Sequence, residues 1–290
     1  MKQIVVLISV LMLASFTVFS QESKINVVVI GAHPDDCDIK AGGTAVLFAE
    51  MGHNVMFVSV TNGDAGHHEM GGGALAKRRM AEAEEAGRRL GVKYVVLDNH
   101  DGELFPYLHI RLDIIRLIRN WNADMVISHR PNDYHPDHRN ASILVQDAAY
   151  MVIVPNVAPD SPPLAKNPVF LYMEDRFQRP NPFRPDIAID VSSVLDKKYY
   201  GMAAHDSQFF EWLPWTAGRL EEVPAFAEER LQWLKNSRRF EISPTVRETL
   251  TKWYGAEKAK NAVSAEAFEI CEYGRRPSDD VIRKLFPMIR

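Results

Sequence analysis

The sequence predicts an α/β fold built around a mostly parallel sheet, and two observations support this prediction. Short aliphatic runs, such as those at 27–30 and 125–128, are typical of parallel strands buried on both faces, and stretches with helical periodicity lie between them. Both runs lead directly into polar turns that contain proline. Because ligands bind at the carboxyl ends of strands in open α/β sheets, these two turns are candidate site loops.

Composition and charge narrow the class of protein. The chain has 290 residues, of which 46% are apolar, enough for one large α/β domain or a domain with an appendage. The formal net charge is −4, from 34 basic and 38 acidic residues, and no dense basic stripe is present. Nucleic acid is therefore not an expected partner. Nothing in the sequence specifies an oligomeric state.

The N-terminus resembles a secretory signal. Lys2 precedes an apolar run from Ile4 to Phe19, which is short for a stable membrane span, although an uncleaved anchor is the alternative. We therefore expect an exported protein, periplasmic or secreted, with a signal peptide at 1–20, a catalytic domain at 21–210 and a helical C-terminal extension at 211–290. Only Cys37 and Cys271 are present, too few for a disulfide framework.

The expected elements alternate along the chain, separated by turns rich in glycine, proline and asparagine. Gly91 is placed to end one of the helices as its left-handed C-terminal residue. Strands are expected at 27–30, 55–60, 94–97, 125–128, 169–173 and 186–190, and helices at 43–50, 74–90, 110–121, 140–151 and 193–210, with further helical segments to the C-terminus.

The first polar turn, Gly31-Ala-His-Pro-Asp-Asp-Cys-Asp38, carries carboxylates beside an imidazole, a combination that favours a cation over a phosphate. His33 and Asp36 are three residues apart and can both reach one metal ion. Asp35 lies between them and stays free, with capping of the next helix as its alternative role. Cys37 is expected to be a bystander.

The second turn repeats this design in His135-Pro-Asp-His138. His33, Asp36 and His138 would supply three ligands, the number with which a catalytic Zn²⁺ keeps a fourth position for water. The predicted chemistry is hydrolysis, with Asp35 as general base and His135 stabilising the oxyanion or protonating the leaving amine. Asp137 is expected to hold one imidazole in its tautomer. A glycine-rich loop with His67 and His68 is either a lid or solvated surface.

At these residues the chain resembles the LmbE-like family of zinc-dependent N-deacetylases, which includes the PIG-L enzymes that act on N-acetylglucosaminyl-phosphatidylinositol. The resemblance rests on Ala32-His-Pro-Asp-Asp36 with Asp38, on Gly42-Gly-Thr44 and on His135-Pro-Asp-His138. It covers about residues 25–210. It implies a Rossmann-like sheet with helices on both faces, and zinc bound by His33, Asp36 and His138.

The resemblance also implies roles for residues outside these motifs. Asp38 would support the site, Arg79 of an Arg-x-x-Glu helix would contact substrate, and His205 lies in a late motif. The predicted function is removal of the N-acetyl group from an N-acetylglucosamine-type sugar or glycoconjugate. In the cell, Fe²⁺ or another divalent metal is the alternative to Zn²⁺ in this site. Alternative functions are hydrolysis of another amide, an iron oxygenase, whose facial triad also has two histidines and a carboxylate, and glycan binding with a relict metal site.

Overall fold

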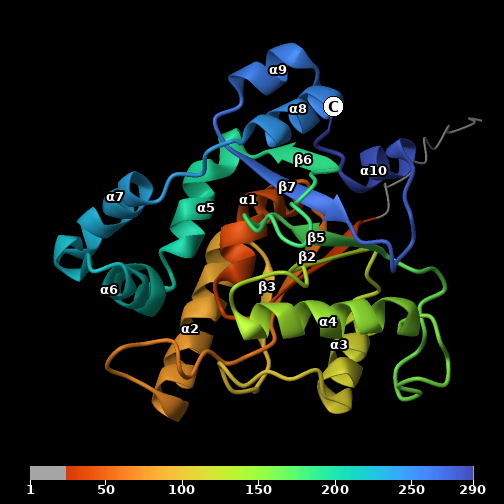
Figure 1. Ribbon diagram of the computed structural model, residues 1–290, viewed down its shortest axis with the longest axis horizontal. Helices are drawn as coiled ribbons and strands as arrows, with labels where there is room; N and C mark the ends of the chain where they lie inside the picture. Colours follow the sequence, from red (N-terminus) through yellow and green to blue (C-terminus); the bar gives the residue numbers. More distant parts are fainter. Residues whose placement is uncertain (1–23, 290) are drawn as a thin grey trace, which may run out of the picture.

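The computed structural model of the chain describes residues 24–289 and has a single twisted sheet at its centre (Figure 1). Its strands lie in the order β3-β2-β1-β4-β5-β7-β6. β1 to β5 are parallel to one another, whereas β7 is antiparallel to both β5 and β6. The strands are β1 Asn26–Gly31, β2 Asn54–Ser59, β3 Lys93–Val96, β4 Met125–Ser128, β5 Val169–Met173, β6 Ile187–Asp190 and β7 Ala265–Ile270.

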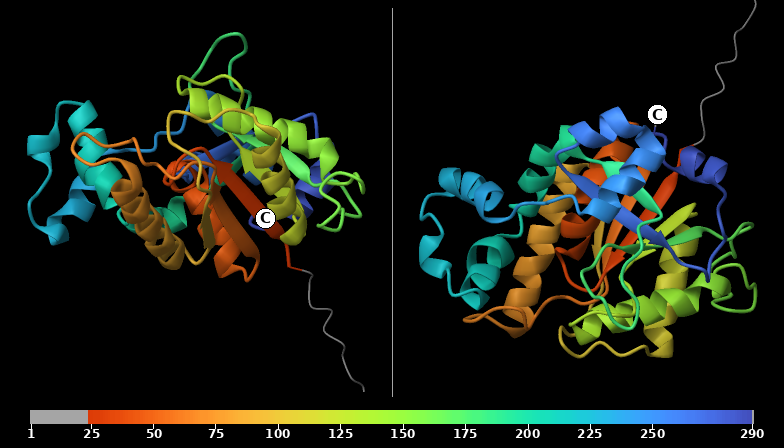
Figure 2. Two further views of the ribbon diagram at one scale, coloured as in Figure 1. Left: turned by 90° about the horizontal axis from the view of Figure 1, so that it is seen from below. Right: turned by 45° about the horizontal axis from the view of Figure 1, so that its top comes forward.

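Helices cover both faces of this sheet, so the predicted α/β class and the mostly parallel sheet are confirmed. Figures 1 and 2 show α6 and α7 at one end of the molecule, beyond α2 and α5. The helices are α1 Asp36–Glu50, α2 Gly72–Leu90, α3 Leu108–Asn120, α4 Pro136–Met151, α5 Leu195–Met202, α6 Leu213–Thr216, α7 Ala227–Ser237, α8 Pro244–Tyr254, α9 Ala256–Asn261 and α10 Asp279–Leu285.

Alternation along β1 distributes its side chains between two cores. Val27 and Val29 pack with residues of α1 and α10 on one face, whereas Val28 and Ile30 pack with residues of α3 and α4 on the other. Both sets are almost fully buried. A continuous aliphatic run therefore becomes a strand that is apolar on both faces, as a parallel sheet between helical layers requires.

The strand order reverses between β1 and β4, and this reversal positions the site. From β1 the chain continues to β2 and then β3 on one side, and it returns to place β4 on the other side of β1. The carboxyl ends of β1 and β4 thus lie side by side at a topological switch point, where α/β sheets open a ligand crevice. The two predicted site turns follow these two strands.

The C-terminal portion is mainly helical, as expected, but it also supplies a strand to the sheet interior. β7 pairs with β5 through Leu171 and Ile270 and with β6 through Ile187 and Phe268. From β7, the Glu266 carboxylate accepts bonds from the backbone N–H groups of Gly43 and Thr44 in α1 and from Lys198 Nζ, at 2.7 to 2.8 Å. Residues beyond 210 are therefore integral to the sheet rather than only packed on it.

Two further expectations differ from the structure or fall outside it. The helix expected at 193–210 is divided into a 3-10 turn at Ser192–Val194, α5, and a π-helix at Ser207–Trp212 that leads into α6. The proposed signal peptide at 1–20 lies outside the described residues. In the described part of the chain, no helix has the length and apolar character needed to cross a membrane.

Candidate metal centre and active site

The turn after β1 fixes the first two predicted ligands. Asp36 opens α1, and its Oδ2 accepts hydrogen bonds from the backbone N–H groups of Ala32 at 3.0 Å and His33 at 2.8 Å. These bonds fold the turn back on itself and direct the Asp36 carboxylate toward the His33 imidazole. Gly31 is needed here because a Cβ at that position would lie 2.6 Å from Cβ of Asp36.

The first turn of α4 carries the third predicted ligand. His135 is the N-cap residue and its Nδ1 accepts a bond from the N–H of Asp137, while Pro136 occupies the first helical position. This start to the helix turns His138 toward the β1 turn, and its side chain is largely buried. The same short motif therefore caps the helix and presents an imidazole to the crevice.

The three predicted ligands converge. Nδ1 of His33 lies 3.2 Å from Nε2 of His138 and 3.5 Å from Asp36 Oδ2, and Asp36 Oδ1 lies 3.4 Å from the same His138 nitrogen. Tetrahedral ligands with bonds of about 2.0 to 2.1 Å to Zn²⁺ would be about 3.3 Å apart. The donor set and its spacing thus fit a divalent metal ion, and the His/Asp cluster can hold one.

Two carboxylates support His33 from its other side. Nε2 of His33 lies 3.0 Å from Asp101 Oδ1 and 3.3 Å from Asp137 Oδ2. Asp137, predicted to hold an imidazole, is itself held by the N–H groups of Gly102 and Leu104. With Nε2 donating to carboxylate, Nδ1 is left to bind a metal ion.

The electrostatics of this cluster favour a cation. Burial alone would lower the pKa of His33, but bonds to Asp101, Asp137 and Asp36 raise it well above its usual value. Burial would likewise raise the pKa of Asp36, but the charges of His138 and His129 and a bond from His129 hold it well below. Such a group of carboxylates binds positive charge strongly, and a bound metal ion would supply that charge in place of protons.

Three site residues were not assigned from the sequence. Asp101 follows β3, His129 directly follows β4, and Asp133 lies 3.0 Å from Nδ1 of His138. The ring of His129 stacks on His138 at 4.2 Å between centroids, and its Nε2 is 3.2 Å from Asp36. Burial, and then the charge of His138, lower the pKa of His129 to about 4. Asp101 and His129 could have been proposed from the sequence, because each follows a strand at the edge of the sheet where ligands bind.

Asp35, the predicted base, does not cap α1. It occupies the N-cap position, but its side chain makes no capping bond and instead accepts from Arg79 Nη2 at 3.2 Å. Arg79 is only 2% exposed and also donates to the Pro34 carbonyl. The structure thus places Arg79 against Asp35, and direct contact of Arg79 with substrate stays a prediction.

His135 lies beside the ligands without belonging to their closest set. Its ring meets that of His33 edge to face at 4.5 Å, and its Nδ1 is engaged by Asp137 N–H. Burial and the neighbouring His33 and His138 lower the pKa of His135. Its Nε2 is therefore the nitrogen available to a reacting group.

Asp38 and Cys37 both point away from the three ligands. Asp38 is fully buried against Tyr94, whose hydroxyl donates at 3.0 Å, and against Nε2 of His205 at 3.2 Å. The expected support of the metal site by Asp38 is thus indirect, because Asp38 joins α1 to β3 and to the segment after α5. The Cys37 thiol faces the carbonyls of Val29 and Val58 in the core, consistent with a bystander.

The loop with His67 and His68 contacts the segment that contains the π-helix and α6. Nε2 of His67 lies 2.7 Å from Glu211 Oε2, and the His68 ring stacks between those of His67 and Trp215. Arg78 of α2 also binds Glu211. The two histidine side chains are therefore held by contacts with Glu211 and Trp215, whereas residues 69–73 of the loop are exposed, and a role as a lid stays a prediction.

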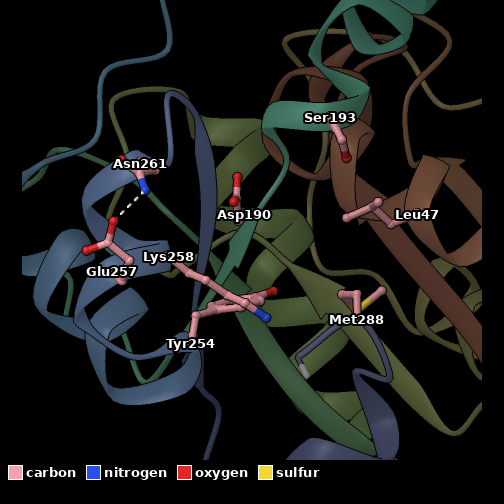
Figure 3. Close-up of a pocket in the computed structure, with 8 residues that line it drawn as sticks. All are labelled: Leu47, Asp190, Ser193, Tyr254, Glu257, Lys258, Asn261 and Met288. Atoms are coloured by element: carbon pink, nitrogen blue, oxygen red, sulfur yellow. Dashed lines mark hydrogen bonds between the residues drawn. The ribbon is translucent and has the colours of Figure 1, made fainter.

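A separate cavity of about 390 Å³ lies between the C-terminal half of α1, β6, α9 and the end of the chain (Figure 3). It contains none of the residues of the metal cluster. Most of its polar side chains are exposed, and Asn261 donates to Glu257 across its rim at 3.2 Å. Its lining is Leu47, Asp190, Ser193, Tyr254, Glu257, Lys258, Asn261 and Met288.

Known proteins that are similar to this chain include several deacetylases. The PIG-L family, described as GlcNAc-PI de-N-acetylase, matches residues 28–149. The chain is 33% identical to diacetylchitobiose deacetylase of Thermococcus kodakarensis over 65% of this chain and 73% of that protein. It is 27% identical to 4-oxalmesaconate hydratase of Pseudomonas putida, over 67% and 78%.

A solved structure extends the match over the fold. The N,N'-diacetylchitobiose deacetylase of Pyrococcus horikoshii superposes with a TM-score of 0.63 at 25% identity, covering 85% of this chain and 84% of that one. The region that matches the PIG-L family, residues 28–149, includes the turn after β1 and the first turn of α4, which carry the metal cluster. The chain therefore belongs to the PIG-L, LmbE-like family of de-N-acetylases.

Proposed function

We propose that this protein is a zinc-dependent hydrolase that removes the N-acetyl group from an N-acetylglucosamine-type sugar or glycoconjugate. One observation carries the proposal. The turns after two strands bring together the ring nitrogens of His33 and His138 and the carboxylate oxygens of Asp36, at distances of 3.2 to 3.5 Å. The carboxylate of the neighbouring Asp35 makes no capping bond. Three ligands with a carboxylate beside them form the arrangement of a hydrolytic metal site.

The roles of the chain's own residues follow from their positions. A bound Zn²⁺ would supply Lewis-acid chemistry, lowering the pKa of water to about 7 and polarising the amide carbonyl. Asp35 is placed to accept the proton of the attacking water, and Arg79 holds that carboxylate in position. His135 is placed to stabilise the oxyanion through Nε2 or to pass a proton to the leaving amine.

The substrate class is supported by the relatives rather than by the site geometry. The diacetylchitobiose deacetylases and the family description, GlcNAc-PI de-N-acetylase, name N-acetylated amino sugars as substrates. The apolar run at 4–19 behind Lys2 supports export, so we place the enzyme in a periplasmic or secreted setting.

A hydratase is the second candidate, because one relative of comparable length is named as a hydratase. Hydration adds water to a carbon–carbon double bond and releases no second product, whereas deacetylation releases acetate. The two activities are therefore separated by product analysis alone.

The test is acetate release from a panel of N-acetylated sugars by the zinc-loaded full chain. We expect turnover that is abolished by a chelator and restored by zinc. Asp35→Asn should retain the metal and lose about 10²-fold or more in kcat, the usual contribution of a positioned base. No acetate from any sugar with zinc bound, or full activity in D35N, would overturn the proposal.

A further inference from the structure

His129 is a buried side chain that contacts two of the three predicted metal ligands. It directly follows β4, and because Ser128 pairs with Ile30 of β1, it lies beside the start of the turn that carries Asp36. Ser128 also donates from Oγ to the Ile30 carbonyl at 3.0 Å. The side chain of His129 is only 3% exposed. Its imidazole is therefore held in one place at the junction of the two site turns.

The first contact of His129 is with the carboxylate of Asp36. Nε2 of His129 lies 3.2 Å from Asp36 Oδ2, and because an ionised carboxylate can only accept, Nε2 is the donor. The N–H of Ala32 lies 3.1 Å from the same nitrogen, but it already donates to Asp36 Oδ2 at 3.0 Å and needs no second acceptor. The N–H of His33 is a further donor to Oδ2, at 2.8 Å.

These three donors decide which oxygen of Asp36 can face a metal ion. A carboxylate oxygen offers about two lone pairs, so Oδ2 is saturated by the N–H groups of Ala32 and His33 and by Nε2 of His129. Oδ1 lies 3.4 Å from Nε2 of His138, on the side of the other ligands. Asp36 would thus offer one oxygen only, which leaves coordination positions for water and for a substrate carbonyl.

The second contact of His129 is with the ring of His138. The two imidazoles are stacked, with 4.2 Å between their centroids and 12° between their planes. The donor atoms of Asp36, His129 and His138 lie close enough together to suggest a ligand set. However, the lone pair of an imidazole nitrogen lies in the plane of its ring, and an ion in the plane of His138 lies outside the parallel plane of His129. This geometry favours support of the ligands over direct binding by His129.

We propose that His129 is a positioning residue, whose Nε2–H holds Oδ2 of Asp36 and so keeps this carboxylate a ligand through Oδ1 alone. The inference rests on the proposed function, because it assigns a role within the metal centre on which that function depends. Partners of this kind fix the orientation of a ligand and affect metal affinity without touching the ion. The competing interpretation is that His129 only fills the space beside His138, where any flat ring would serve.

The test uses two variants that separate the hydrogen bond from the packing. H129F keeps a flat ring against His138 but has no donor. H129Q loses the ring and keeps a donor, because its amide nitrogen is as many bonds from Cβ as Nε2 of histidine is. Each full-length variant is loaded with Co²⁺, whose visible absorption reports the number and arrangement of its ligands. Zinc affinity is measured by competition with a chelator, and H109F, at an exposed histidine, is the control.

We expect H129F to bind zinc about 10- to 100-fold more weakly than the wild type, the usual effect of removing the partner of a ligand. Its cobalt bands should shift, because Asp36 is then free to offer both oxygens. H129Q should recover most of the affinity and the wild-type bands, and H109F should match the wild type. If H129F does not fold, H129L, which also lacks a donor, should show the same weakening.

The other outcomes overturn the inference in distinguishable ways. Wild-type affinity and bands in H129F would show that the hydrogen bond has no such role, as would impairment of H129Q alone. Loss of metal from both variants, as complete as in H138A, would identify His129 as a ligand rather than a positioning residue. A wild type that binds neither cobalt nor zinc would overturn the metal centre itself. Metal binding with the expected order of variants, but without acetate release, would contradict the deacetylase and leave the role of His129 supported.

Discussion

At the residue scale, the orientation of His33 explains how two loops can share one ion. Its Nδ1 faces His138 and Asp36, and its Nε2 faces Asp101 and Asp137. The carboxylates on the Nε2 side fix which nitrogen is free for the metal, and they increase the basicity of that nitrogen. Loss of such support usually weakens a metal site without removing a ligand.

We therefore predict that Asp101→Asn lowers zinc affinity by about 10- to 100-fold while the chain stays folded. The reason is that an amide at this position binds the Nε2–H of His33 less strongly than a carboxylate does. Zinc affinity is measured by competition with a chromogenic chelator. The exposed Asp113 of α3 provides the control, and D113N should bind zinc as the wild type does. Equal affinities in D101N and D113N would show that Asp101 does not support the ligand.

How much of the site the sequence could predict depended on distance along the chain. His33, Asp35 and Asp36 lie close together in one turn, and His135 and His138 in another, so local motifs were sufficient to propose them as site residues. Asp101 belongs to a third loop, and only the parallel strand order brings that loop to His33. The place of Arg79 beneath Asp35 is a tertiary contact between two helices, which spacing alone could not distinguish from a surface arginine.

At the element scale, a buried ion pair connects β7 to the helix that carries the site. Lys198 Nζ of α5 donates to Glu266 of β7 at 2.8 Å and to the carbonyl of Ile39 in α1 at 2.8 Å. Both side chains are almost fully buried. The pair thus holds three elements together directly behind the first turn of α1.

Replacing Lys198 with Met should cost about 3 to 5 kcal/mol of unfolding free energy, because it leaves the Glu266 carboxylate buried without its cation. The neighbouring Lys197 offers a matched control, since its pair with Glu50 is exposed. K197M should change stability by less than about 1 kcal/mol. Urea unfolding of both variants is the measurement, and similar losses in the two would contradict a structural role for the buried pair.

The ion pairs of Glu211 predict a pH effect on stability. Bonds from Arg78 and then His67 lower the pKa of the Glu211 carboxyl to about 2 against burial, compared with an ordinary value of 4.5. A carboxyl with a depressed folded-state pKa stabilises the protein above its unfolded pKa, and this contribution is lost as the pH falls from about 4.5 through about 2. Glu211→Gln should therefore make the unfolding free energy less dependent on pH in this window. If the unfolding free energy of the variant depended on pH as steeply as that of the wild type, this role of Glu211 would be contradicted.

The sequence could not reveal β7 for a physical reason. Its residues, Ala-Glu-Ala-Phe-Glu-Ile, are mostly of high helix propensity, and helices precede and follow it. The strand forms because it pairs on both sides with β5 and β6 and buries Glu266, Ala267 and Phe268. Tertiary pairing thus overrides local preference, as it does more often for strands than for helices. The strands β4 and β5, by contrast, were predicted with their observed bounds.

At the scale of the whole molecule, the C-terminal portion completes the fold that holds the site. β7 lies between β5 and β6, and α10 contributes Ile282 and Leu285 to the core that also contains α1. Removal of this portion would expose the edges of two strands and one face of the core. The part that precedes it is therefore not expected to be an independent unit.

A chain shortened to end at residue 261 should fail to fold cooperatively. It lacks β7 and α10 and leaves β5 and β6 with unpaired backbone groups. Thermal unfolding followed by circular dichroism should show no sharp transition, in contrast to the full chain. A shortened chain that unfolds cooperatively and still binds zinc would show instead that the C-terminal portion is an appendage.

The account as a whole depends on one metal ion shared by the turns after β1 and β4. Its most direct test is the metal content of the purified full chain, measured by elemental analysis after zinc loading and dialysis. We predict one equivalent of zinc per chain in the wild type and in His109→Ala, which changes an exposed histidine, and a loss of that zinc in His138→Ala. A wild type that holds no zinc, or an H138A variant that keeps its full equivalent, would contradict the shared site.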